Sequence, residues 1–211
     1  MTARRTNTKA REAATALRNE TERTCVVCRA QREASGMVRL AVRAGGLVLA
    51  ARGKERGVSV CLARACLEGL APKVVSKVTG LPVSFELCTL LADLHAAAEA
   101  RVLEMVGLAR RTGTLVAGVD EVHGGEGGTV ILAEDLAARG ERRLPDGRRF
   151  VSGARLGHAA GMGYLGALRI PSGPLSEQAA TWLSLWYESR PSGLDRGDDA
   201  GRFGSVSQAS S

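Results

Sequence analysis

Aromatic residues are scarce in this sequence of 211 residues: they make up 3% of it, whereas apolar residues as a whole make up 45%. The scarcity argues against a surface on which bases stack along a row of exposed rings, but the apolar fraction suffices for a buried core. The sequence has no run of 18 apolar residues and no apolar signal segment near its N-terminus. We therefore expect a cytoplasmic protein that does not span a membrane.

Catalytic motifs are also missing. The three histidines, His95, His123 and His158, are far apart in the sequence, and none has a serine or cysteine partner motif. The glycine-rich nucleotide-binding pattern G-x4-G-K-[ST] does not occur. We therefore expect a protein that is not an enzyme.

Positive charge is concentrated in the first part of the chain. Residues 1–80 contain 16 Lys and Arg against 6 Asp and Glu, while the rest of the chain contains 13 against 16. The net charge of +7 therefore comes from the first part. A concentrated positive surface favours a polyanionic partner, with nucleic acid first and an anionic membrane second, and a basic surface without a partner is the alternative.

The first half reads as a small α/β domain with one thin sheet. Alternating apolar residues predict a strand over 37–42, Gly45 and Gly46 predict a turn, and strands are expected over 47–49 and 58–61. Helices are expected over 62–70 and 72–78, the second one beginning on Pro72. Residues 1–21 are polar and basic, and we expect a disordered arm there.

The second half predicts a further α/β domain. Apolar residues recur every three or four positions from Ser84 for about 25 residues, which indicates a helix capped by Ser84. A buried central strand is expected over 129–133. A short strand is expected after a helix stop at Gly113, and other strands over 148–151 and 164–170. Helices are expected over 136–143, from 156 and over 176–187. The expected organisation is an arm (1–21), a thin-sheet domain (22–98), an α/β/α sandwich (99–188) and a disordered tail (189–211).

Four of the five cysteines suggest a metal site. Cys25 and Cys28 have the C-x2-C spacing with which two thiolates bind one metal ion, and Cys61 and Cys66 could supply the other two ligands of a tetrahedral structural zinc. Buried cysteines without metal are the alternative. A redox-active C-x-x-C pair is a third option, but the strand–helix context that such a pair needs is not present in the sequence. Cys88 shares a helix face with Leu87 and Leu91 and is expected in the core.

Two segments are candidates for contact with phosphate. One is a basic glycine turn, in which glycine allows close backbone approach and cations add charge; it comprises Arg52, Lys54, Arg56 and Gly57. The other is the pair Lys73 and Lys77, one helical turn apart. The alternative for the basic glycine turn is a solvated turn between strands that contacts no phosphate.

Gly118, Asp120 and Glu121 stand where a strand gives way to a helix. The two carboxylates could cap that helix, or they could accept hydrogen bonds from base edges.

The first half resembles the bacterial YlxR family, whose members are small proteins regarded as RNA-binding. The matching segments run from Arg23-Thr24-Cys25-Val26-Val27-Cys28-Arg29 through 37–42 and 53–61 to Cys66-Leu67 and 73–78. The resemblance covers about residues 22–98 and adds Arg29 to the expected nucleic-acid-binding residues. Glu55, Val58 and Ser59 depart from the family's Gly-Arg-Gly-Ala-aromatic turn.

The second half resembles the kink-turn-binding ribosomal-protein family, including its bacterial YlxQ branch. The resemblance covers about residues 99–188 and rests on the segments 107–113, 118–122, 130–135 and 156–161. In that family a Gly-x-Asn-Glu helix start contacts sheared G·A pairs, which implies a role for Gly118, Asp120 and Glu121. Asp120 stands at the Asn position, and Gly124 stands where the family has a basic residue.

The expected function is non-enzymatic RNA binding through a basic face of the first domain, in RNA metabolism, transcription or translation. A DNA-binding transcription regulator is one alternative. Another is a protein adaptor on the transcription or ribosome-assembly machinery that would expose Trp182 and Trp186, although packing of the last helix onto the sheet is the preferred expectation.

Overall fold

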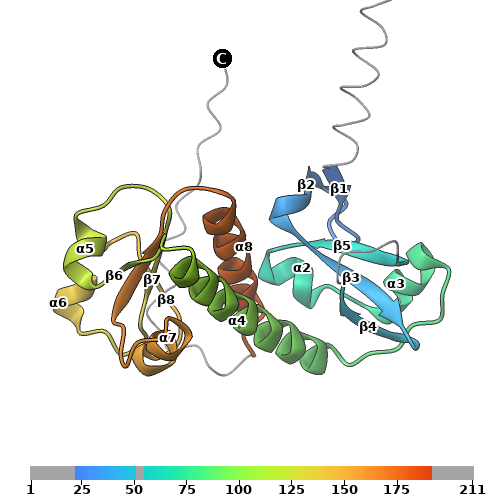
Figure 1. Cartoon of the computed structure of the whole chain (residues 1–211). Coiled ribbons are helices and arrows are strands. Elements are labelled where there is room, and N and C mark those ends of the chain that lie inside the picture. Colours follow the sequence, from blue (N-terminus) through green and yellow to red (C-terminus); the bar gives the residue numbers. More distant parts are fainter. Residues whose placement is uncertain (1–21, 51–54, 192–211) are drawn as a thin grey trace, which may run out of the picture.

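The computed structural model describes residues 22–50 and 55–191. The predicted basic arm and most of the predicted tail lie outside these residues, as do Arg52 and Lys54. Two units, each containing a small sheet, lie side by side and share one long helix (Figure 1). The expected α/β class is confirmed.

The N-terminal unit contains a hairpin and a three-stranded antiparallel sheet in the order β4-β3-β5. The hairpin consists of β1 (Glu22–Thr24) and β2 (Gln31–Glu33), followed by the 3-10 helix η1 (Ala34–Gly36). The sheet consists of β3 (Met37–Arg43), β4 (Gly46–Leu49) and β5 (Gly57–Cys61), and two helices follow, α2 (Arg64–Glu68) and α3 (Pro72–Thr79). Val38 faces Val60 and Leu40 faces Val58 across β3 and β5, so these four side chains form one apolar face.

The turn between β3 and β4 lies one residue earlier than the glycine pair predicted. Ala44 and Gly45 both have positive φ, 47° and 77°, and Gly46 pairs with Arg43 as the first residue of β4. Positive φ at both central positions is the geometry that matches the twist of a two-residue hairpin. Gly45 adopts it without strain, and Ala44 is held in it by the paired strands.

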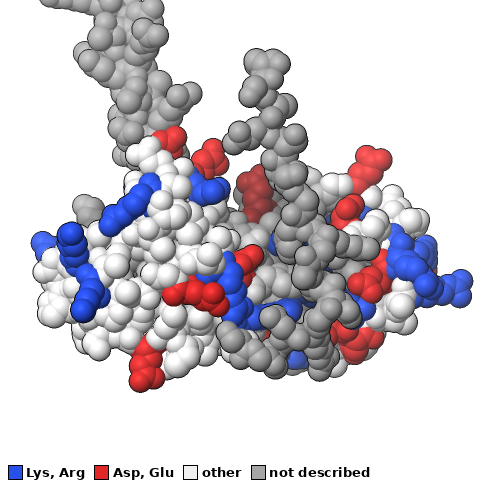
Figure 2. All heavy atoms as spheres, turned by 180° about the vertical axis from the view of Figure 1, so that it is seen from behind, with Lys and Arg blue, Asp and Glu red and all other residues white. Residues whose placement is uncertain are grey.

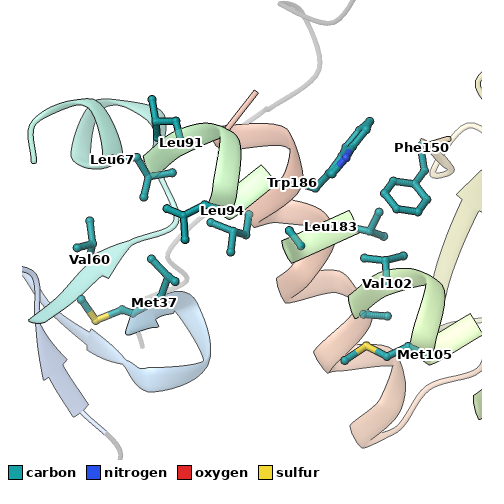
Figure 3. Packing of buried hydrophobic residues seen from close by; sticks show 14 of the residues in the cluster. Met37, Val60, Leu67, Leu91, Leu94, Val102, Met105, Phe150, Leu183 and Trp186 are labelled. Atoms are coloured by element: carbon teal, nitrogen blue, oxygen red, sulfur yellow. The ribbon is translucent and has the colours of Figure 1, made fainter. Parts of the chain in front are cut away.

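The shared helix is α4 (Leu87–Arg111). It begins three residues after Ser84, so the predicted cap is wrong: the Ser84 amide instead donates to the Gly45 carbonyl oxygen at 2.8 Å. The helix continues without interruption through residue 98, where the sequence suggested a domain boundary. Its buried residues belong to one cluster that includes Met37 and Val60 of the first unit and Phe150 and Leu183 of the second (Figure 3).

The C-terminal unit contains a four-stranded mixed sheet in the order β6-β9-β7-β8. Its strands are β6 (Val116–Ala117), β7 (Thr129–Leu132), β8 (Arg148–Arg149) and β9 (Ala167–Ile170). Its helices are α5 (Val119–His123), α6 (Ala138–Glu141), α7 (Gly153–Ala159) and α8 (Pro174–Glu188). The expectation that β7 is an inner, buried strand is confirmed.

Successive residues of β7 point to opposite faces of this sheet, and each face has its own apolar cover. Ile131 belongs to the large cluster that contains α4 and α8, whereas Leu132 belongs to a second cluster with Val122 of α5 and Leu144. The arrangement is the expected α/β/α sandwich. The helix predicted to start at Leu156 instead runs from Gly153 to Ala159, because Gly153 and Gly157 permit close contact with the segment at Gly163 and Tyr164.

Helix α8 joins the two units. It packs along α4, and Trp186 is 6% exposed between His95 and Phe150, with ring centroids 4.9 and 4.8 Å away. Trp186 is thus buried against α4 and Phe150 and not exposed, and Trp182 is half-buried. Glu188 accepts a hydrogen bond from the Arg64 amide at 2.8 Å, which satisfies a free N–H group at the start of α2. The shared core and this contact fix the two units against each other.

Among the described residues, every helix is too short or too polar to serve as a membrane span.

The shared core predicts that one substitution destabilises both units. Leu94 is 1% exposed, so Leu94→Ala should lower the free energy of unfolding by about 2 to 5 kcal/mol. Urea titrations followed by tryptophan fluorescence, which reports α8, and by hydrogen exchange in β3 should show the same shift. Leu108→Ala is the control, because Leu108 is 42% exposed. A shift in one unit alone would contradict a shared core.

Candidate metal centre and basic surface

The segment between β1 and β2 is a tight turn that brings Cys25 and Cys28 together. The Cys25 amide donates to the Ala30 carbonyl oxygen at 2.9 Å, and the Arg29 amide donates to the Cys25 carbonyl oxygen at 3.0 Å. Arg29 has φ of 64°, a left-handed conformation that costs about 1–2 kcal/mol for a residue with a side chain. Contacts outside the turn must therefore hold this shape.

The other two cysteines come from elements that pack against this turn. Cys61 is the last residue of β5, and Cys66 lies in α2. The Val26 amide donates to the Ser59 carbonyl oxygen at 2.9 Å, which sets the turn beside β5. The sulfur atoms of all four cysteines lie within 4.8 Å of one another, and Cys28 Sγ is 3.7 Å from Cys61 Sγ. Three elements thus place four sulfur donors in one cluster, a candidate metal site.

The thiols of this cluster do not ionise equally. Burial disfavours the Cys25 thiolate, but hydrogen bonds from the backbone at Cys61, Cys28 and Val27 outweigh it and lower the pKa of Cys25 to about 6. Burial, together with the sulfur atoms of Cys25 and Cys28, raises the pKa of Cys61 to about 11 and that of Cys66 to about 12. Metal binding requires deprotonated ligands, and burial works against deprotonation at Cys61 and Cys66.

The fifth cysteine is elsewhere. Cys88 lies near the start of α4 and is exposed, so the expectation of a core position is wrong. Its neighbours Leu90 and Leu91 face the core instead.

The predicted basic residues that the structure describes are all exposed on the N-terminal unit: Arg29, Arg56, Lys73 and Lys77. In α3, Val75 is buried, which leaves Lys73 and Lys77 on the outer side of the helix. Figure 2 shows Lys and Arg side chains at the edge and at the top of this unit, on one face of the molecule. Within residues 22–50 and 55–191, no carboxylate forms an ion pair with these four residues.

Glu55, the acidic residue of the basic glycine turn, has an internal partner. Its carboxylate accepts a hydrogen bond from Arg43 at 2.7 Å, and its carbonyl oxygen accepts one from Arg39 at 2.9 Å. Glu55 therefore neutralises Arg43 and leaves Arg56 unpaired among the described residues.

Gly57 has a structural reason to be glycine. It is the first residue of β5 and pairs with Ala41 of β3. A Cβ atom at this position would lie 2.0 Å from the Leu40 carbonyl oxygen. Close strand pairing is sufficient reason for a glycine at this position, and a phosphate contact of Gly57 stays a prediction.

The second predicted site lies at the start of α5, at the opposite end of the molecule from α3 (Figure 1). Gly118 has φ of 107°, and a Cβ atom there would lie 2.3 Å from the Glu121 carboxylate, which folds back over it. Asp120 is exposed and pairs with Arg143 at 2.5 Å. The two sets of predicted residues therefore form separate sites.

Sequence reasoning missed two features of the C-terminal unit. Arg169 is 7% exposed and donates to the carbonyl oxygens of Val122 and Gly127, so it holds the C-terminal end of α5. Met162 and Tyr164, in the loop between α7 and β9, are 38% and 54% exposed. Burial and the neighbouring Asp135 raise the pKa of Tyr164. The glycines at 161 and 163 were the available sign of an unusual loop.

No protein-family model and no curated protein matches this sequence. Among solved structures, one similar chain is a protein with unknown function from Bacillus halodurans C, which is 22% identical. The match covers 39% of this chain and 95% of that chain, with a TM-score of 0.37. A likeness this distant leaves the function to be argued from the residues of the chain itself.

Gly57→Ala tests whether Gly57 serves the sheet or a ligand. Because the added methyl group meets the backbone, we expect it to lower the free energy of unfolding by about 3 kcal/mol or more. Urea unfolding measures this change. Gly36→Ala is the control, since no atom lies within 4 Å of its added Cβ. A Gly57→Ala protein with unchanged stability but weaker RNA binding would indicate instead that Gly57 contacts phosphate.

Proposed function

We propose that the four-cysteine cluster binds a structural zinc ion. Thiolates bind zinc at about 2.3 Å, and a tetrahedron with that radius has edges of about 3.8 Å. The separation of 3.7 Å between the Cys28 and Cys61 sulfur atoms fits such an edge and is far longer than a disulfide bond of about 2.05 Å. The proposed ligands are Cys25, Cys28, Cys61 and Cys66.

Zinc at this site would have a structural role. Four thiolates leave no open position for a substrate or an activated water molecule. Strands β1 and β2 have three residues each, and a hairpin this short is marginally stable alone. Zinc would tie the hairpin to β5 and α2, which supply the other two ligands.

We propose further that the chain is a non-enzymatic RNA-binding protein. The observation that carries this proposal is the set of exposed cations on the N-terminal unit, Arg56, Lys73 and Lys77, which have no carboxylate partner among the described residues. In the second half, Arg101 and Arg155 are paired with glutamates, whereas Arg110, Arg111, Arg139 and Arg142 are exposed without an ion pair among the described residues. The second half also has more acidic than basic residues, 16 against 13, which offsets these cations. Unpaired cations on one unit produce the positive potential that attracts a phosphate backbone.

Helix α3 is well suited to hold two of these cations in place. Pro72 begins the helix, and Gly80 ends it with φ of 69°, a favourable stop. Because Val75 anchors the inner side, Lys73 and Lys77 have a fixed spacing of one turn. The surface formed by Arg29, Arg56, Lys73 and Lys77 is the proposed RNA contact.

The C-terminal unit would add a second contact through Gly118, Asp120 and Glu121. Carboxylates can accept hydrogen bonds from base amino groups. The ion pair between Asp120 and Arg143 must open for this, which would make the contact weaker and more selective than the first. Of the two rings proposed for a protein adaptor, Trp186 is buried and Trp182 is half-buried, which favours RNA over protein as the partner.

The zinc proposal predicts that Cys25→Ser abolishes stoichiometric metal. Protein purified without chelator should contain about one zinc per chain by elemental analysis, and the variant less than about a tenth of that. Cys88→Ser is the control, because Cys88 lies outside the cluster and is exposed. Equal metal contents in the wild type and Cys25→Ser would contradict the proposal.

The RNA proposal predicts that replacing Arg56, Lys73 and Lys77 together by Gln weakens binding of single-stranded RNA. Three lost phosphate contacts reduce the slope of log affinity against log salt by about 2. The control replaces Arg101, Arg110 and Arg155, three exposed cations of the other half. Fluorescence anisotropy at several salt concentrations measures the RNA affinity of both variants and its salt dependence. Unchanged affinity in the first variant would refute the assignment, and tighter binding of duplex DNA would favour a DNA regulator.

A further inference from the structure

The hairpin beside the cysteine cluster separates its charges by face. Its register places Arg23 opposite Arg32 and Glu22 opposite Glu33. Directly opposite residues of an antiparallel pair point to the same face, and adjacent residues point to opposite faces. The two arginines therefore share one face of the hairpin and the two glutamates share the other.

This register is unfavourable for the isolated hairpin. Like charges directly opposite each other repel, whereas a shift that placed Arg opposite Glu would attract. All four side chains are exposed, and among the described residues neither arginine forms an ion pair with a carboxylate. The two guanidinium groups remain available to a ligand of opposite charge.

We propose that Arg23 and Arg32 form an arginine pair that binds the phosphodiester backbone of RNA. The Cβ atoms of directly opposite residues are about 5 Å apart, so both guanidinium groups can reach one phosphate or two consecutive ones. Guanidinium groups match phosphate oxygens with paired N–H donors. The inference rests on the proposed RNA function and adds residues that the sequence analysis did not assign.

The position of the pair supports this assignment. Strand β1 contacts β5, the strand that Arg56 precedes, so the pair belongs to the same unit as Arg56, Lys73 and Lys77 and lies on the hairpin that also carries Arg29. Figure 2 shows both basic and acidic side chains at the end of this unit from which the grey N-terminal trace leaves, and basic side chains at its outer edge. In the proposal, one RNA strand bound along the N-terminal unit contacts both groups of cations.

The competing explanation is electrostatic balance at the metal site. A zinc ion with four thiolates carries a net charge of −2, which nearby arginines would offset without any RNA. The two explanations make different predictions. Phosphate contact predicts an effect on RNA affinity and its salt dependence, and charge balance predicts an effect on the retention of zinc.

The test compares Arg23→Gln/Arg32→Gln with Glu22→Gln/Glu33→Gln, a control with equal spacing on the other face of the same hairpin. The full chain is titrated into a fluorescein-labelled oligouridylate at several salt concentrations, and zinc retention against a chelator is measured in parallel. The arginine variant should lose about 5- to 25-fold in affinity at 0.1 M salt, with a slope smaller by about 0.7 to 1.4. The control should bind as tightly as the wild type or more tightly.

Three outcomes would overturn the inference. The first is unchanged RNA affinity in the arginine variant together with faster zinc loss, which assigns the pair to charge balance. The second is an equal loss of affinity in the glutamate control, which assigns the effect to hairpin integrity. The third is that the arginine variant keeps the RNA affinity of the wild type while the Arg56/Lys73/Lys77 variant loses it. That result refutes the role of Arg23 and Arg32 and leaves the proposed function intact. A wild type that binds no RNA refutes the proposed function itself.

Discussion

The convergence of four cysteine sulfurs is the constraint on which the N-terminal unit depends. A short hairpin, the end of β5 and helix α2 meet where these sulfurs lie within 4.8 Å of one another. None of these elements is long enough to be stable by itself. Arg29 has a left-handed conformation beside the cluster, which the local sequence alone would not favour. In our proposal zinc holds this arrangement, and the basic surface next to it keeps its shape as a result.

Helix α4 extends that constraint to the rest of the chain. It contributes Leu91 and Leu94 toward the first unit and Val102 and Met105 toward the second (Figure 3). The cavity left by removing one of these side chains would weaken packing on both units, because a shared core transmits strain. The two proposed RNA contacts, at α3 and at α5, lie at opposite ends of the molecule (Figure 1). The fixed packing of α8 against α4 would keep their separation constant.

The sequence predicted what depends on local patterns. The alternation of Val38, Leu40 and Val42 identified β3, and the apolar run at 129–132 identified an inner strand. The cysteine spacing identified which four residues come together. These features follow from side-chain periodicity and from ligand geometry, which a single sequence contains.

Features that depend on tertiary contacts were missed or misplaced. Ser84 fits the pattern of a helix cap, but its amide donates a hydrogen bond to the carbonyl oxygen of Gly45, which lies much earlier in the sequence. The start of α7 at Gly153 was not predicted. Glycine is necessary there because Tyr164 approaches its backbone closely, and the local sequence does not reveal that contact. The β1–β2 hairpin has exposed side chains throughout and lacks an apolar signal, so only its pairing register revealed the opposed arginines.

The central claim is that a metal-held N-terminal unit binds RNA. The most direct test measures the affinity of the full chain for single-stranded RNA before zinc removal, after removal with a chelator, and after zinc is restored. The account predicts that affinity falls on removal by about the factor seen for the Arg56/Lys73/Lys77 variant and returns on restoration. Full RNA affinity in protein shown to be free of metal would contradict it.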